Sequence, residues 1–423
     1  MNPLTRTNRI GNHLGIASMI LLAASVPTSM AGQNIAAGIS LAAALLFLWP
    51  LKKEKLPCEP SLCPLLLMLI LVLISIPFSI YPNKSLGKFP EIELWLIFIF
   101  FVPMIFIRTR KLFTIVTGVV IAAAVTAAVY SFVQIATFAG PPDPGDPVGY
   151  RPSGFFSFYL TFANVMGMTA VILWGIALSG KWNTRRMLAA AGAGLLITAL
   201  ILSKSRGPFI AMALSVSAVA LLRIRSRKGL FVFLALILAA AGTIFIVPSL
   251  RARFFSIFNF SKYHDFENNY AIADRLTRWH IGWNMIREHP VLGVGYGIFA
   301  TCMPVFNTTG HTIFPSHAHS IYVNIAAESG LPSCLCLITT FFLLLRKFFL
   351  DDRRFSNPLG ICFFGLVIYY AAAGLTEEVW SDAESFNAFW FLAGLGAACS
   401  RLFNQTPVPQ TDSAEINTTP SQG

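Results

Sequence analysis

Charged residues are scarce in this 423-residue sequence: Asp, Glu, Lys and Arg together make up 12%, about half of their share in soluble domains. Hydrophobic residues make up 55%, and 37 residues are Phe. A soluble domain could not bury this much apolar surface. Apolar runs of about 20 residues recur along the chain, each long enough to cross a bilayer as a helix. The composition therefore excludes a soluble protein and predicts an all-α polytopic membrane protein.

The sequence also lacks a basic stripe interleaved with aromatic residues, although its formal net charge is +12. The Lys and Arg residues lie in short segments between apolar runs. No nucleic-acid partner is expected, because such binding needs positive charge gathered on one surface. The seven Cys residues show no metal-type spacing, so neither a metal centre nor a disulfide framework is indicated.

Twelve apolar runs are long enough to be membrane spans. Their predicted limits are 14–30, 34–50, 62–81, 90–107, 113–138, 157–178, 187–202, 208–222, 230–248, 320–345, 358–376 and 385–400. With the N-terminus in the cytoplasm, the inner segments hold 20 of the 31 Lys and Arg residues. Positive charge marks the cytoplasmic side. The long segment between spans nine and ten is therefore expected to face outward.

These spans predict one transmembrane domain, residues 1–403, which includes the outward, partly helical loop 249–318. Residues 404–423 are rich in Thr, Pro, Ser and Gln and lack aromatic residues, a composition that predicts a disordered cytoplasmic tail. The first span has an alternative interpretation as a cleaved signal peptide, because Arg6 and Arg9 precede it and small residues follow it. Cleavage would leave the later spans in the same orientation.

The large outward loop contains an amphipathic helix, residues 271–289. Its apolar residues recur at alternating spacings of four and three, in one stripe: Ile272, Leu276, Trp279, Trp283 and Ile286. Arg275 falls at the edge of this stripe, whereas Arg278 is expected to point away from it. Arg275 should therefore lie beside the surface that the stripe covers. The plain alternative is that Arg275 only reaches from an interfacial helix to the lipid headgroups.

Two further basic residues, Lys204 and Arg206, lie in the tight outward turn between spans seven and eight. Gly207 breaks one helix, and Pro208 suits the first turn of the next. The free N–H groups of a helix start therefore lie beside two cations, an arrangement that can bind phosphate. The alternative is again contact with headgroups, although positive charge is depleted on the outer side.

His317 and His319 lie where the large loop re-enters the membrane. A neutral imidazole can take a proton from a hydroxyl near pH 7. No metal site is predicted from these residues and His311, because no Cys or carboxylate nearby in the sequence completes a ligand set. Glu328 lies nine residues after His319, which is two and a half turns of a helix. The two side chains would therefore lie on opposite sides of that helix, so Glu328 is not expected to orient His319.

These outward residues resemble the O-antigen ligase and polymerase superfamily. Its histidine motif is His, then Asn, Ser or Gln, nine residues, Gly, two residues, and Gly, Thr or Tyr. His319-Ser320 and Gly330 match this motif, whereas Ser333 departs from its last position. The stretches 275–279 and 289–295 look like the family's Arg-to-Trp helix and Pro-Gly turn. Ser205-Arg206-Gly207 resembles its other arginine turn.

The resemblance implies a GT-C-like glycosyltransferase in the bacterial inner membrane. Such ligases move a glycan from undecaprenyl diphosphate to a sugar hydroxyl of lipid A core, in the periplasm, with inversion and without a metal or other cofactor. Arg206, Arg275 and Lys204 would then bind the diphosphate, since guanidinium groups stabilise the growing charge of such a leaving group. His319 would deprotonate the acceptor hydroxyl.

Acidic residues in the last outward loop, Glu377, Glu378 and Asp382, could line an acceptor pocket. Asp274, in the large loop, is interpreted as a solvated charge. Three alternatives stay open: a polymerase whose acceptor is a second lipid-linked glycan, a ligase acting on protein hydroxyls, and a transporter or flippase of polyprenyl-linked glycans. Transporters keep functional charges near the membrane midplane. Here most ionisable residues lie at span ends, with Glu328 as the exception.

Overall fold

The computed structural model describes residues 6–48, 59–91, 97–138, 149–179, 183–223, 266–354 and 359–404, together with scattered positions between 230 and 255. The predicted ninth span, 230–248, lies largely outside the described residues. The predicted tail, 404–423, also lies outside the described residues, except for residue 404.

Every regular element in the described part of the chain is a helix. In chain order the α-helices are α1 (Arg6–Ser25), α2 (Met30–Leu48), α3 (Cys63–Ser75), α4 (Pro82–Gly87), α5 (Phe98–Phe106), α6 (Arg110–Phe138), α7 (Tyr159–Leu178), α8 (Thr184–Leu202), α9 (Arg206–Arg223), α12 (Phe266–Glu288), α13 (Phe299–Phe306), α14 (Ile321–Arg354), α15 (Gly360–Ala373) and α16 (Ala383–Asn404). Short 3-10 turns, Pro60–Leu62 and Phe89–Glu91, precede α3 and follow α4.

Seven of the described helices are long and apolar enough to cross a membrane: α2, α6, α7, α8, α9, α14 and α16. The apolar helices Pro60–Ser75 and Gly360–Ala373 are shorter. The prediction of an all-α membrane protein is thus confirmed, whereas the number of twelve spans stays a prediction. Several predicted limits differ from the structure: α1 spans Arg6–Ser25 rather than 14–30, α3 ends at Ser75 rather than at 81, and α14 continues to Arg354 rather than to 345.

Helices α7 and α16 form the centre of the bundle. In each, 89% of the apolar window is buried, because both sequences are apolar around most of the helix circumference. Helix α7 packs against α8, α9 and α15, and α16 packs against α5 and α7. In α6 and α8 only 28% and 33% of the window is buried. Their apolar outer faces are those expected of helices that contact lipid.

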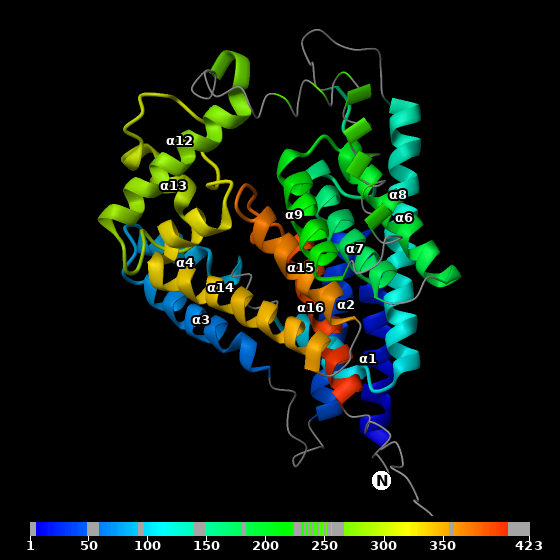
Figure 1. The fold of residues 1–423 in the computed structure, drawn as a ribbon. Coiled ribbons are helices and arrows are strands. Elements are labelled where there is room, and N and C mark those ends of the chain that lie inside the picture. The colour runs from blue at the N-terminus through cyan, green and yellow to red at the C-terminus, as the bar shows by residue number, and fades with distance from the viewer. Residues whose placement is uncertain are drawn as a thin grey trace, which may run out of the picture.

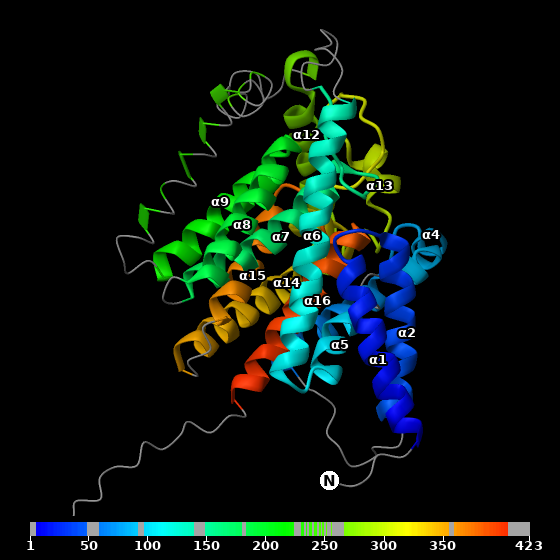
Figure 2. The same cartoon turned by 90° about the vertical axis from the view of Figure 1, so that its right-hand side faces the viewer.

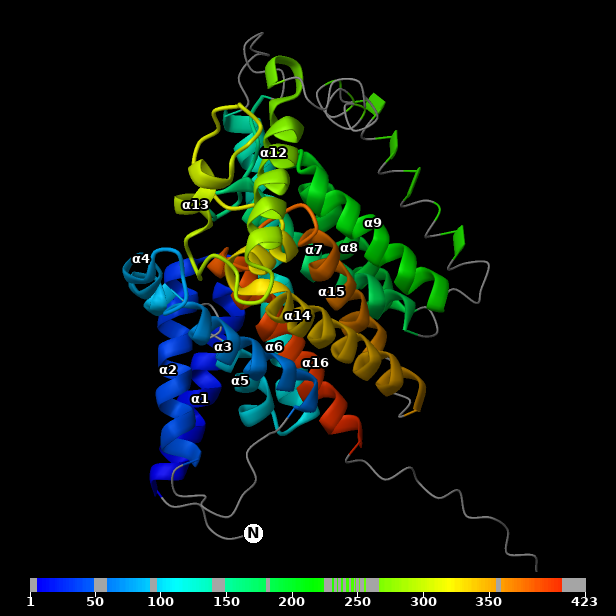
Figure 3. The ribbon, with the colours of Figure 1, turned by 90° about the vertical axis from the view of Figure 1, so that its left-hand side faces the viewer.

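Helices α12 and α13 lie at one end of the bundle, and α1 begins at the opposite end (Figures 1, 2 and 3). The predicted topology requires this relation between the large loop and the N-terminus. Two helix starts contact the loop between α15 and α16. At the start of α14, the N–H of Ile321 donates to the carbonyl of Gly374. At the start of α9, Gly207 lies against Glu377. The loop between α15 and α16 thus joins several helix starts at that end.

The helix predicted in the large loop is present as α12, but its buried face is not the predicted stripe. Trp283 of the stripe is 57% exposed, whereas Arg278, which was expected to point away, is only 3% exposed. The buried positions are Ala273, Asp274, Thr277, Arg278, Ile281, Gly282, Met285 and Ile286. The prediction was wrong because it counted only apolar residues, and an Asp–Arg pair can be buried when each charge satisfies the other.

Candidate active site

The histidine motif begins just before α14 and continues into this helix, which is broken at Gly330. The backbone there has φ 83° and ψ 165° inside α14, so the helical hydrogen bonds around it are interrupted. The carbonyl oxygens of Ala327 and Glu328 instead accept hydrogen bonds from the N–H groups of Val294 (2.8 Å) and Gly295 (2.9 Å). The predicted Pro-Gly turn is therefore docked on the break in α14, and the two motifs form one backbone joint.

This joint leaves no room for a side chain at its glycines. A Cβ at Gly330 would lie 1.9 Å from the carbonyl oxygen of Val291, and one at Gly293 would lie 2.3 Å from the carbonyl carbon of Glu328. Both glycines have positive φ, which other residues adopt at a cost. Ser333, where the sequence departs from the family motif, is fully buried and donates to the carbonyl of Ser329 at 2.7 Å.

Replacing Gly330 by Ala should therefore loosen the joint that carries the histidines. Strain at positive φ and the clash with the carbonyl oxygen of Val291 should each lower the free energy of unfolding by roughly 1–3 kcal/mol. We expect Gly330→Ala to lower the apparent Tm in detergent by several degrees. Gly118→Ala in α6 is the matched control, because a Cβ there meets nothing within 4 Å. An equal Tm for both variants would contradict the joint.

His319 lies just before the start of α14 with its ring against that of His317. Its φ of 53° is in the left-handed region, which costs free energy and is more frequent at functional positions. The N–H of Ala318 donates to Oδ1 of Asn324 (3.1 Å), and the N–H of His319 donates to Nδ1 of His317 (3.2 Å). The two ring centroids are 4.4 Å apart, edge to face. Local hydrogen bonds thus hold the backbone at Ala318 and His319, from which the imidazole projects.

Asp274 of α12 faces the ring of His319. Its Oδ2 is 3.8 Å from Nε2 of His319, beyond hydrogen-bond range, and accepts a hydrogen bond from Nε of Arg278 at 2.8 Å. Arg278 also donates to the carbonyl oxygens of Phe314 (2.8 Å) and His317 (3.4 Å). Arg278 therefore holds both the carboxylate and the segment that leads to His319. The interpretation of Asp274 as a solvated charge was wrong; its (i, i+4) spacing from Arg278 was the available signal.

Both imidazoles are neutral at pH 7. Burial lowers the pKa of His319 to about 3, and His317 and the arginines of α12 add to the effect. Burial and then Arg278 lower the pKa of His317 to about 4. Because Nδ1 of His317 accepts a hydrogen bond, its proton is carried on Nε2. Nδ1 of His319 is buried and has no hydrogen-bond partner among the described residues.

Arg275 is paired with Glu377, in the loop between α15 and α16. Its Nη2 lies 2.7 Å from Oε1 of a carboxylate whose side chain is 5% exposed. The same oxygen lies 3.1 Å from the position of a Cβ on Gly207, at the start of α9. Arg206, the first residue of α9, is 8% exposed, and the ammonium of Lys204 lies toward the segment before α7. The structure thus brings Arg275 and the start of α9 to one carboxylate.

The other two acidic residues of this loop have separate partners. Glu378 is buried and accepts a hydrogen bond from the hydroxyl of Ser381 at 3.2 Å. Asp382 accepts one from Ser385, at the start of α16, at 2.5 Å. Burial raises the pKa of Asp382 to about 7. The hydrogen bond from Ser385 therefore places Asp382 at the start of α16. Asp382 had been grouped with Glu377 only because the two residues are close in the sequence.

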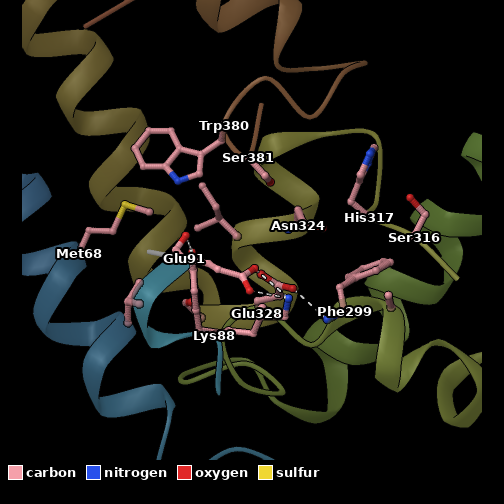
Figure 4. Close-up of a pocket in the computed structure, with 16 residues that line it drawn as sticks. Met68, Lys88, Glu91, Phe299, Ser316, His317, Asn324, Glu328, Trp380 and Ser381 are labelled. Carbon is pink, nitrogen blue, oxygen red and sulfur yellow. Dashed lines mark hydrogen bonds and ion pairs between the residues drawn. The ribbon is translucent and has the colours of Figure 1, made fainter. Parts of the chain in front are cut away.

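A cavity of about 310 Å³ opens beside His317. Its walls come from α3, the turn after α4, α13, α14 and the loop before α16 (Figure 4). On one wall Nζ of Lys88 pairs with Glu91 at 2.8 Å. On another, Oε1 of Glu328 accepts the N–H of Phe299 at 2.8 Å. Sequence patterns had not indicated this cavity, because its walls are far apart along the chain.

Among the described residues, no group of three or more His, Cys, Asp or Glu side chains is arranged to hold a metal ion. His317, His319 and Asp274 lie close together, but Oδ2 of Asp274 already accepts from Arg278. Metal independence of the reaction stays a prediction.

The described helices form a membrane protein that brings Arg275, His319 and the start of α9 together at one end of the bundle. Residues 191–338 match the family model of the O-antigen ligases. The match runs from within α8 into α14 and includes Arg206, Arg275, His319 and Gly330. The resemblance to the O-antigen ligase and polymerase superfamily is thus confirmed, and with it an activity of the ligase or polymerase type. No curated protein that was compared matches the chain.

Proposed function

We propose that this protein is an O-antigen ligase. It transfers a glycan from undecaprenyl diphosphate to a sugar hydroxyl of lipid A core, at the periplasmic face of the inner membrane, with inversion and without a metal. One observation carries the proposal: Arg275 and the start of α9 converge on Glu377, and Asp274, the residue before Arg275 in α12, faces a neutral His319. An anion site and a proton acceptor thus lie side by side.

The diphosphate of the donor binds at Arg206 and Arg275, with Lys204 beside them. Guanidinium groups give phosphate bidentate, charge-assisted hydrogen bonds, and the first turn of α9 adds the positive end of a helix dipole. Negative charge on the diphosphate grows as the glycosidic bond breaks. These donors therefore stabilise the transition state more than the ground state.

His319 takes the proton of the attacking hydroxyl. The acceptor oxygen forms a bond to the anomeric carbon while the bond from that carbon to the diphosphate oxygen breaks. The proton passes to His319, and undecaprenyl diphosphate leaves with the bonding electron pair. Asp274, 3.8 Å from Nε2, stabilises the imidazolium as it forms. A single displacement of this kind inverts the configuration of the anomeric carbon.

A transfer assay with purified protein tests this function. A defined glycan on undecaprenyl diphosphate is supplied with two competing acceptors, lipid A core and a second lipid-linked glycan. We expect the glycan to appear on lipid A core, with release of undecaprenyl diphosphate only when the acceptor is present. Growth of the lipid-linked glycan instead would identify a polymerase. Movement of the donor across a bilayer without any transfer would identify a transporter.

The pH dependence of transfer should differ between the free and the donor-bound protein. Because the pKa of His319 is lowered to about 3, its imidazole is unprotonated at any pH well above that value. kcat/KM, which reports the free protein, should therefore stay flat from pH 7 down to about pH 5. A bound diphosphate offsets the charge of Arg275, so the pKa of His319 rises and the acid limb of kcat moves to higher pH.

Steady-state kinetics between pH 5 and 8, with donor ionisation measured separately, provide both profiles. An acid limb of kcat/KM close to about pH 6.5, the ordinary value for His, would contradict this prediction, because it would mean that His319 is not desolvated in the free protein.

A further inference from the structure

The cavity beside His317 lies next to the proposed reaction centre but is not used by the steps above. Ser316 and His317 line it, whereas His319 faces Asp274 on α12. The loop between α15 and α16 borders both places. Its Glu377 holds Arg275, and its Trp380 and Ser381 line the cavity. His317, whose ring contacts that of His319, therefore links the cavity to the proposed reaction centre.

The charges of the cavity are opposite to those of the arginine site. Glu91 and Glu328 contribute carboxylates, and Lys88 is the one cation among the residues that line the cavity. The hydroxyl of Ser381 donates to Glu378, which places a third carboxylate behind the wall. A phosphate or carboxylate group would be repelled there. A ligand with hydroxyl or amino groups would find acceptors.

The shape and lining of the cavity match a sugar ring. Figure 4 shows Trp380 and Met68 on the side opposite His317 and Ser316, with Lys88, Glu91 and Glu328 along the edge between them. Aromatic and apolar side chains can cover the C–H face of a pyranose, while the carboxylates accept from its hydroxyls. The volume of about 310 Å³ is at the low end of small-molecule sites, which fits one ring rather than a chain.

We propose that this cavity is the acceptor subsite and that it binds one uncharged or amino-bearing sugar ring of the acceptor. The proposal rests on the proposed function, because an acceptor is needed only by a glycan transferase. A ring held here lies against His317, whose own ring contacts His319. One hydroxyl of the bound ring is then presented from the cavity toward the histidine pair. The choice of acceptor sugar is then determined by cavity residues that include Lys88, Glu91 and Trp380.

Equilibrium binding to the full-length protein in detergent tests the subsite, with calorimetry as the measurement. The probe is the core oligosaccharide released from rough lipopolysaccharide. Ala300, on α13, lines the cavity, so Ala300→Phe fills it and should weaken binding at least about tenfold. Val305→Phe is the matched control, because Val305 lies on the same helix and is 63% exposed. It should bind as the unaltered protein does.

A second variant is needed because Ala300→Phe could lose binding through misfolding alone. The side chain of Glu91 is 63% exposed, so Glu91→Gln should keep its fold and still weaken binding of the core oligosaccharide about tenfold, since a charged acceptor of hydrogen bonds is lost. Affinity for undecaprenyl diphosphate should be unchanged in both variants. Unchanged oligosaccharide binding in both, or a loss confined to the undecaprenyl-linked donor, would overturn the proposal.

The charge of the cavity gives an independent readout. The methyl glycosides of glucose and glucosamine should compete with the core oligosaccharide, and the glycoside of glucuronic acid should not. Competition by the glucuronide alone would overturn the assignment of ligand class. None of these measurements needs catalysis. A protein that binds the oligosaccharide in the cavity but never transfers glycan would refute the proposed function and leave the sugar site standing.

Discussion

His319→Ala should lower the rate of glycan transfer by about 10²–10⁴, the usual contribution of a general base, with little change in donor affinity. The imidazole is neutral because burial lowers its pKa to about 3, and Asp274 is placed to stabilise its protonated form. Loss of the ring therefore removes the proton acceptor and leaves the diphosphate site. Transfer is measured with purified protein at saturating donor and acceptor.

His311→Ala is the matched control for this variant, because His311 lies in the same loop and is exposed. We expect it to transfer glycan at the rate of the unaltered protein. The donor affinity of His319→Ala is checked with undecaprenyl diphosphate as the probe. Normal turnover by His319→Ala would remove the residue from the mechanism and leave His317 as the candidate base.

Arg275→Gln should reduce kcat by about 10²–10³, the effect of removing one donor that stabilises a developing anion. This substitution also leaves the carboxylate of Glu377 without its 2.7 Å partner. Loss of a hydrogen bond to a charged group costs about 1.5–3 kcal/mol of stability. A fall in activity alone would therefore not separate a role in catalysis from a role in folding.

The double variant Arg275→Gln, Glu377→Gln separates these roles. It removes both charges and keeps two side chains that can hydrogen-bond, so most of the lost stability should return. If Arg275 binds the diphosphate, transfer stays low although the apparent Tm recovers. Recovery of transfer together with the Tm would show that the pair is only structural. Thermal unfolding in detergent and the transfer assay are measured on the same preparations.

The class of protein followed from composition, and the positions of the key residues followed in part from motifs. The predicted helix in the large loop is α12, and the predicted turn between spans seven and eight is the start of α9. Such features are local, since helices and their starts depend on neighbouring residues. The same local patterns led to the wrong buried face of α12. Periodicity of apolar residues could not show that Arg278 is buried by carbonyl groups from positions 314 and 317.

The roles of two glycine motifs also depended on their meeting in space. Gly330 and Gly293 were recognised as parts of separate motifs, but only the folded chain shows that the turn of one fills the break of the other. Open carbonyl oxygens of the broken α14 are satisfied by N–H groups of the turn. Hydrogen bonds between distant segments leave no periodic signal in a sequence.

By itself the sequence determined that the chain is an all-helical membrane protein with basic and histidine motifs of one family, because apolar length and residue spacing are properties of short segments. Tertiary structure alone decided that Asp274 faces His319, that Glu377 holds Arg275, and that a carboxylate-lined cavity lies beside His317. A buried charge is stable only where partners from other helices surround it. Those partners are brought together by packing, which no single stretch of the chain encodes.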